Sequence, residues 1–217
     1  MDKSTVITLL ILATLGISWT IVYLLIIYRS FKDKMCGMPA IVLAFNMFWE
    51  FLYSFVFLNQ GQEIQIWVNR VWFFFDVVIF TSFILYGARA WQETNRRFFI
   101  PFVLFTLISA FSFLYLMQLD FGEKAITYSA FLINVFMSAS FIDLLLKQQD
   151  LRGQSFGIAF LKMTGTLAAT IVLFQRYSYF LQLLGVLCFV LDMIYIVMIV
   201  DRYKKLNLHL ITRRLKN

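Results

Sequence analysis

Seven apolar stretches, each about as long as a bilayer crossing, constrain the fold of this 217-residue chain more than any other feature. A hydrocarbon core of about 30 Å needs roughly 20 helical residues at about 1.5 Å each. The predicted spans are residues 6–28, 39–58, 66–86, 99–119, 126–146, 156–174 and 179–200. A lipid-facing backbone must satisfy its own hydrogen bonds, and these stretches are about twice as long as barrel strands. The sequence therefore predicts an all-α, seven-helix bundle forming one membrane domain over residues 1–217.

The composition agrees with a membrane protein. The chain is 61% hydrophobic and only 14% charged, which exceeds what a soluble domain of this length hides in one core. It also excludes a disordered or secreted protein. Cys36 falls in a short polar loop and Cys188 in an apolar stretch, so both are predicted to be free thiols.

Lysine and arginine residues gather on one side of the predicted membrane. They lie in the loops after the first, third and fifth spans and in the C-terminal tail, whereas the other side carries only Lys3, Lys124 and Arg176. The positive-inside rule then predicts an outside N-terminus and a cytoplasmic C-terminus, in a bacterial inner membrane or an endoplasmic reticulum membrane. The net charge of +7 reflects this topology and attraction to membrane lipids, and it does not indicate a nucleic-acid partner.

Three acidic residues lie near the middle of predicted spans: Glu50, Asp76 and Asp192. A charge at this depth costs roughly 2.5–3.5 kcal/mol on insertion scales, so each is a functional hypothesis. Asp76 has Trp72 four residues before it and no polar partner on its own helix. Its carboxyl is therefore expected to bind either a cation from another span or a group of the substrate. Asp192 shares a helical face with Cys188 and Tyr195.

Three other charged residues favour structural interpretations. Arg70 and Lys162 lie nearer the ends of their spans, where their long side chains can extend the charged group toward the interface. Asp143, near the inner end of the fifth span, is predicted to be interfacial.

Glu50 has the most informative neighbours in sequence. Asn46, Tyr53 and Ser54 lie four residues before, three after and four after it, which places them along one helical face. This polar stripe offers an amide and two hydroxyls that can orient a carboxyl group. Desolvation disfavours the ionised form, so the carboxyl is expected to retain its proton and to act as a proton donor. The alternative is a hydrogen bond between helices that only stabilises the bundle.

Several chemistries are excluded by missing residues. The one histidine, His209, lies in the tail, which rules out bis-histidine haem and histidine-rich metal sites, and the seventh span has no lysine for a retinal Schiff base. Glycine-rich phosphate loops and aspartate-rich motifs for a magnesium diphosphate are also missing. We expect no metal and no cofactor. Carboxyl groups among many aromatic rings remain, and they suit proton-initiated cyclisation of a polyene.

Three segments carry a family resemblance. Residues 46–51 (NMFWEF), 70–76 (RVWFFFD) and 191–195 (LDMIY) resemble the small seven-span integral-membrane terpene cyclases of meroterpenoid and indole-terpenoid pathways. The resemblance implies a cyclase of the isomerase or lyase class. Its substrate would be a prenylated, lipid-like molecule of farnesyl or geranylgeranyl type. A pathway prenyltransferase and an epoxidase are possible partners, and the oligomeric state stays open.

The resemblance also implies roles for individual residues. Glu50 would protonate a terminal epoxide or alkene, and Asp192 would be the second essential acid, which hydrogen-bonds to Glu50, re-protonates it or balances charge. Both carboxyl groups are expected to meet in one dry chamber. The final proton acceptor stays open between water and a carboxylate. The predicted substrate-binding residues are Asn46, Trp49, Tyr53, Trp72, Asp76 and Tyr195.

A small proton- or cation-coupled transporter with a three-plus-one-plus-three helix repeat is the main alternative. A shift of 116 residues places Asp76 on Asp192 and Asn46 on Lys162, which is weak support for a duplication. The prolines argue against it, because both lie at span starts and give no paired breaks within spans. A heptahelical receptor or an assembly factor is the other alternative, without a specific sign in its favour.

Overall fold

The computed structural model describes residues 3–58, 63–90, 93–174, 178–210, 213 and 215. Within these residues it contains seven α-helices, a short helix of π type (η1) that continues α2, and a 3-10 helix (η3) that precedes α4. The elements are α1 Lys3–Asp33, α2 Ala40–Phe51, η1 Leu52–Val56, α3 Glu63–Ala90, η3 Glu93–Phe98, α4 Phe99–Phe121, α5 Glu123–Lys147, α6 Phe156–Phe174 and α7 Tyr179–Lys205. The predicted all-α, seven-helix fold is confirmed.

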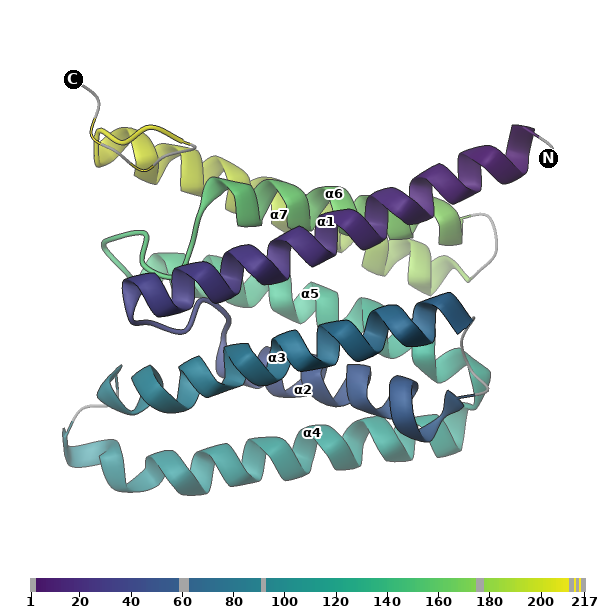
Figure 1. Ribbon diagram of the computed structural model, residues 1–217, viewed down its shortest axis with the longest axis horizontal. Coiled ribbons are helices and arrows are strands. Elements are labelled where there is room, and N and C mark those ends of the chain that lie inside the picture. The colour runs from purple at the N-terminus through teal and green to yellow at the C-terminus, as the bar shows by residue number, and fades with distance from the viewer. Residues whose placement is uncertain are drawn as a thin grey trace.

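Two groups of helices make up the bundle. α2 packs against α3 and α4, and α6 packs against α1 and α7. α1 and α5 join the two groups, because α1 also contacts α3 while α5 contacts α7, α2 and α4. Figure 1 shows the N- and C-termini at opposite ends of the bundle. Side chains of α1 and α5 therefore reach the interiors of both groups.

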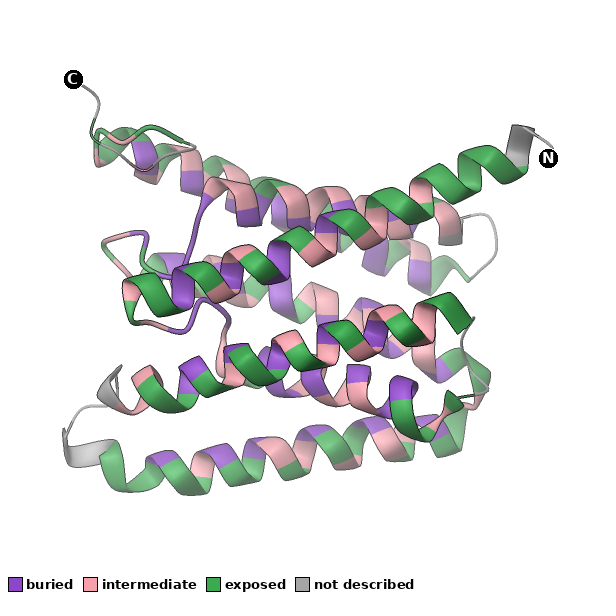
Figure 2. Ribbon diagram, in the orientation of Figure 1, coloured by how far each residue is buried: buried purple, intermediate pink, exposed green. Residues whose placement is uncertain are grey.

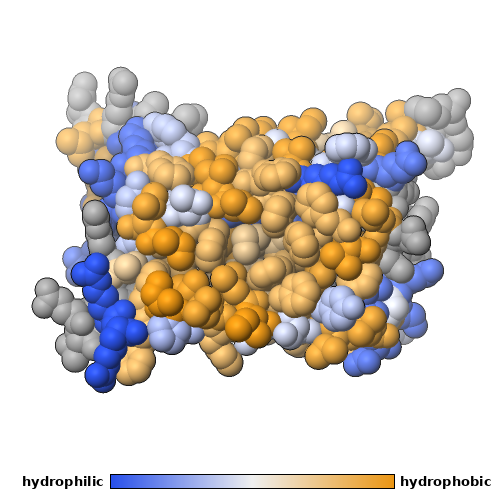
Figure 3. Space-filling model, turned by 60° about the horizontal axis from the view of Figure 1, so that its bottom comes forward, coloured by the Kyte–Doolittle hydropathy of each residue, from blue (hydrophilic) through white to orange (hydrophobic). Residues whose placement is uncertain are grey.

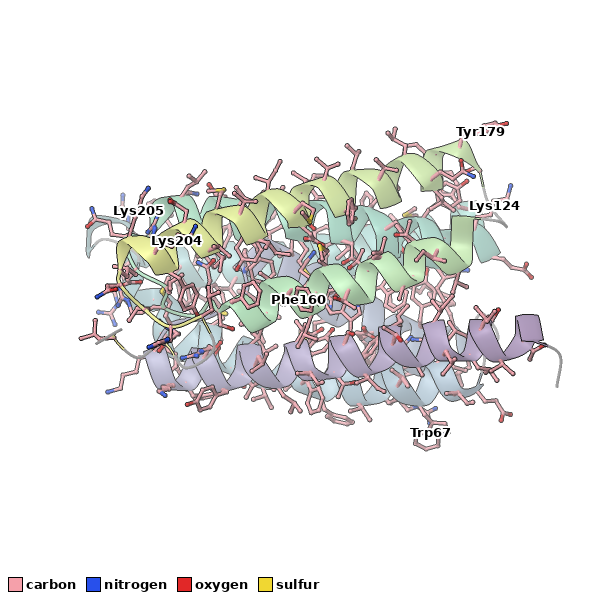
Figure 4. All side chains as sticks on the ribbon, turned by 90° about the horizontal axis from the view of Figure 1, so that it is seen from above. Trp67, Lys124, Phe160, Tyr179, Lys204 and Lys205 are labelled. Atoms are coloured by element: carbon pink, nitrogen blue, oxygen red, sulfur yellow. The ribbon has the colours of Figure 1, made fainter. Side chains whose placement is uncertain are left out.

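The outer surface of the bundle is apolar. Figure 3 shows an orange band of hydrophobic residues between hydrophilic ends, and Figure 2 shows the buried positions on the inward faces of the helices. Lys204 and Lys205 lie at one end and Lys124 at the other (Figure 4). Among the residues that the structure describes, five helical segments are long and apolar enough to cross a membrane, while Ala40–Val56 and Phe156–Val172 are shorter. This surface suits a hydrocarbon environment.

The end of α2 departs from a regular α-helix. In η1 the Phe57 backbone N–H donates to the Leu52 carbonyl at 2.8 Å, five residues back, which widens the turn directly after Glu50. Arg70 of α3 donates from Nε to the Ser54 carbonyl at 3.2 Å, and its guanidinium lies 4.4 Å from the Trp67 ring centre. These contacts agree with a structural role for Arg70, and its extension toward the membrane interface stays a prediction. The Asp143 side chain is exposed and paired with Lys147, and its position at the membrane interface stays a prediction.

The loops that follow α1 and α5 meet through two glycines. A Cβ atom on Gly37 would lie 2.4 Å from the Gly153 carbonyl oxygen, and one on Gly153 would lie 2.8 Å from the Gly37 Cα. The Asp33 carboxylate accepts hydrogen bonds from the Gly153 N–H at 3.0 Å and from Arg213 at 2.8 Å. This contact fixes the ends of α1 and α6 against each other.

Gly153→Ala is expected to destabilise the protein by about 1–3 kcal/mol, because Gly153 has a φ of +72° and its Cβ would strike backbone. Thermal unfolding in detergent measures the change. Gly16→Ala is the matched control: a Cβ at this helical position meets nothing within 4 Å, so we expect no loss of stability. Equal melting temperatures for Gly153→Ala and wild type would contradict the close backbone contact.

Candidate acid site

Three helices assemble one acidic centre in the bundle. Asn46 of α2 donates through Nδ2 to the Tyr23 hydroxyl of α1 at 2.6 Å and to Asp76 Oδ2 of α3 at 2.7 Å. Asp76 is fully buried, and its Oδ1 has no hydrogen-bond partner among the described residues. Its partner from another helix is therefore an amide and not a cation.

Glu50 lies beside this network with an exposed fraction of 3%. The Tyr23 hydroxyl, which accepts a hydrogen bond from Asn46, also hydrogen-bonds to the Glu50 carboxyl. Asn69 of α3, with its side-chain amide nitrogen turned toward the carboxyl, donates to Glu50 Oε2 at 3.3 Å. Glu50 and Asp76 thus form a pair of neighbouring carboxyl groups that is closed off from water.

The predicted polar stripe of α2 is only partly correct. Asn46 belongs to the acidic centre, but the Tyr53 hydroxyl donates to Gln118 Oε1 of α4 at 2.8 Å, and the Ser54 hydroxyl donates to the backbone carbonyl of Glu50. The expectation that both hydroxyls orient the Glu50 carboxyl is therefore wrong. The physical reason is that other acceptors compete for these hydroxyls: a serine in a helix commonly bonds to the carbonyl four residues back, and Tyr53 reaches the side chain of a neighbouring helix.

A second centre lies between α5, α6 and α7. Lys162 Nζ of α6 donates to Asp192 Oδ1 of α7 at 2.8 Å and to the Ser138 hydroxyl of α5 at 2.6 Å. The exposed fractions of the Lys162 and Asp192 side chains are 0% and 1%. The expectation that Lys162 extends toward the interface is wrong: its charge is compensated inside the protein, so the ammonium gains nothing by reaching water.

The predicted aromatic residues divide between the site and its surroundings. Trp72 stacks on Tyr23 with ring centres 5.8 Å apart and donates to the Thr20 hydroxyl at 3.1 Å, so it lies at the first centre. Trp49 donates to the Ser129 hydroxyl of α5 at 3.0 Å. The Tyr195 hydroxyl donates to Gln154 Oε1 at 2.9 Å. The hydrogen bonds of Trp49 and Tyr195 therefore connect structural elements of the bundle.

Within the described part of the chain, no hydrogen bond joins Glu50 of the first centre to Asp192 of the second. Helix α1, however, contacts both centres. Tyr23 belongs to the first, while Trp19, one turn earlier, has the Lys162 ammonium 5.9 Å from its ring centre. The two rings lie 6.2 Å apart. Sequence reasoning missed Trp19 and Tyr23, which sit in an uncharged apolar run. Their spacing of four residues was the available signal.

Comparison with known proteins places this arrangement in a family. The model of the Pyr4-like transmembrane terpene cyclases matches residues 2–203. The chain is 27% identical to terpene cyclase pyr4 of Aspergillus fumigatus over 195 residues, covering 83% of this chain and 80% of the relative. It is 29% identical to terpene cyclase macJ of Penicillium terrestre, covering 78% and 67%, and 29% identical to asnovolin H synthase nvfL of Aspergillus novofumigatus, covering 76% and 68%.

No solved structure gives a significant match to this chain. The family match, which spans nearly all of the sequence, agrees with the long apolar helices in indicating a multi-pass membrane protein. The chain belongs to the Pyr4-like transmembrane terpene cyclases and is a membrane-embedded terpene cyclase.

Proposed function

We propose that Glu50 starts cyclisation by protonating the terminal epoxide or alkene of a prenylated substrate with a farnesyl- or geranylgeranyl-type chain. The observation that carries this proposal is the burial of two carboxyl groups, those of Glu50 and Asp76, around the hydrogen-bonded network of Tyr23 and Asn46. Two neighbouring carboxyl groups without water cannot both be ionised at low cost, so the pair holds a proton. A protonated carboxyl in such a place is a general acid.

We assign the donor role to Glu50 because Asp76 already accepts a hydrogen bond from Asn46 through Oδ2. Both residues are buried, with exposed fractions of 3% for Glu50 and 0% for Asp76. Asp76, as the nearest acidic neighbour, disfavours ionisation of Glu50 by like-charge repulsion.

The reaction balances without an added reactant. The Glu50 proton bonds to the epoxide oxygen, the carbon–oxygen bond breaks, and the electrons of successive double bonds close the rings. Positive charge then moves along the chain until a carbon–hydrogen bond releases its proton and leaves an alkene. Tyr23, Trp72 and Phe75 supply aromatic faces beside the acid, and such faces stabilise positive charge. The product is an isomer of the substrate.

An assay of the wild-type protein tests the substrate class. The purified protein in lipid nanodiscs is incubated with a farnesylated aromatic compound that ends in an epoxide, and separately with its alkene analogue. We expect mass spectrometry and NMR to show a ring-containing isomer from at least one of the two. Chelation with EDTA should leave the rate unchanged, because the proposed acid is a carboxyl group. Recovery of both substrates unchanged, with empty nanodiscs as control, would contradict the proposed substrate class.

We also propose that the C-terminal end of α7 faces the cytoplasm. The basic residues Arg202, Lys204 and Lys205 lie in its last turn, and Figure 4 shows Lys204 and Lys205 at the end of the bundle opposite Lys124. A C-terminal reporter that is active only in the cytoplasm should be active in cells. Activity of a periplasmic or lumenal reporter at the same position would reverse the orientation.

A further inference from the structure

The ion pair of α6 and α7 differs chemically from the acid pair of α2 and α3. Asp192 Oδ1 accepts a hydrogen bond from Lys162, which in turn is held by Ser138. Asp192 Oδ2 is buried and has no hydrogen-bond partner among the described residues. The first centre therefore contains two carboxyl groups, whereas the second contains one carboxylate beside one ammonium group.

This difference determines what each centre does with a proton. A carboxylate that accepts a charge-assisted hydrogen bond from a buried ammonium is stabilised in its ionised form, and removal of either charge would leave the other uncompensated. An ionised carboxylate has no proton to give. Its second oxygen has lone pairs available, and a proton or a positively charged carbon is what such an oxygen attracts.

We infer that Asp192 is the general base that ends cyclisation, through Oδ2, and that Lys162 and Ser138 are positioning residues that keep it ionised and oriented. This inference rests on the proposed role of Glu50 as the initiating acid. In the final step a carbon–hydrogen bond next to the cationic carbon breaks. Its electron pair forms the alkene, and the proton bonds to Oδ2. Before the next turnover Asp192 loses this proton and Glu50 gains one, so the cycle consumes and releases no net proton.

The position of α1 supports a division of labour between the two centres. Tyr23 contacts the acid pair, and Trp19 lies under the Lys162 ammonium, so two neighbouring rings of one helix connect the centres. Gly165 of α6 lets α6 approach closely, because a Cβ there would lie 2.7 Å from the Trp19 ring. α1 thus places one aromatic ring beside each of the two centres, where such rings can stabilise positive charge.

Asp192→Asn tests the base. The amide keeps the shape and an oxygen that accepts from Lys162, but it is a far weaker base. We expect substrate consumption to continue, while the share of the wild-type alkene among the products falls at least roughly tenfold. Alcohols formed by water addition and isomeric alkenes should replace it. Asp143→Asn, at an exposed ion pair, is the matched control and should give the wild-type product pattern.

Ser138→Ala tests positioning with less risk to folding, because it removes one hydrogen bond and no charge. It should shift the product pattern in the same direction as Asp192→Asn but less, and Ser138→Thr, which retains the hydroxyl, should restore it. A purely structural serine would change stability and leave the ratio of products unchanged. Wild-type product ratios in both Asp192→Asn and Ser138→Ala would overturn the inference.

Two further outcomes separate this inference from the proposed role of Glu50. If a folded Asp192→Asn protein consumes no substrate, Asp192 acts in a step that precedes ring closure. This result also overturns its assignment as the terminal base. If Glu50→Gln retains full turnover while Asp192→Asn changes the product pattern, the assignment of Asp192 as the terminal base is supported. A group other than Glu50 then donates the initiating proton.

Discussion

Replacing Glu50 by glutamine is expected to lower the rate of cyclisation by roughly 10²–10⁴-fold, the usual contribution of a general acid. The amide has nearly the same shape and still accepts a hydrogen bond from Asn69, but it cannot give up a proton to an epoxide or alkene. Initial rates of product formation at saturating substrate measure the effect. A reduced kcat with little change in KM indicates loss of an interaction made in the transition state.

Asp201→Asn is the control for this experiment. The Asp201 side chain is 55% exposed and paired with Lys205, so the same change of charge there should leave the rate unchanged. Melting temperatures of both variants identify any loss of folded protein. A Glu50→Gln rate within a few-fold of wild type contradicts Glu50 as the donor.

Asp76 is the specific rival, because its Oδ1 is buried without a partner among the described residues. If Asp76 is the donor, Asp76→Asn loses the activity that Glu50→Gln retains. If Glu50 is the donor, Asp76→Asn keeps the acid and loses the neighbouring charge that helps to keep it protonated. We then expect a smaller reduction of the rate than in Glu50→Gln.

The helices could be predicted from the sequence because hydropathy reports which backbone segments lipid can surround. The predicted span 156–174 coincides with α6, and 99–119 lies within α4, Phe99–Phe121. The same argument missed the π-type turn at Leu52–Val56, since hydropathy does not detect a local change in the hydrogen-bonding pattern of a helix. The assignment of Tyr53 and Ser54 as partners of the Glu50 carboxyl failed because spacing along one helix does not reveal competing acceptors on the backbone or on a neighbouring helix.

The partners of the deep charges could not be derived from the sequence in the same way. Position along a span gives the depth of Glu50, Asp76 and Asp192, but the helix neighbours decide which side chains meet. The Asn46–Asp76 hydrogen bond joins residues 30 apart in sequence, and so does the Lys162–Asp192 ion pair. The rule that buried membrane charges are paired could have suggested the second pair, because Lys162 is the one basic residue within the last four predicted spans.

Lys162→Met is expected to have the largest effect on stability, a loss of about 3–5 kcal/mol. It removes one charge from a fully buried pair and leaves Asp192 uncompensated, while methionine fills most of the volume of the lysine chain. For a domain of this size the melting temperature in detergent should fall by on the order of 10 °C. Lys147→Met, at a pair whose side chains are 72% and 58% exposed, should cost no more than about 1 kcal/mol.

The double variant Lys162→Met/Asp192→Asn separates the charge from the packing. Removing both charges leaves no buried ion to compensate, so we expect it to regain most of the stability lost in Lys162→Met. A double variant as unstable as the single one would mean that packing of the lysine chain, and not the ion pair, stabilises this part of the bundle. A double variant that regains its stability still lacks the Asp192 carboxylate. We therefore expect it to be folded and to form the same product pattern as Asp192→Asn.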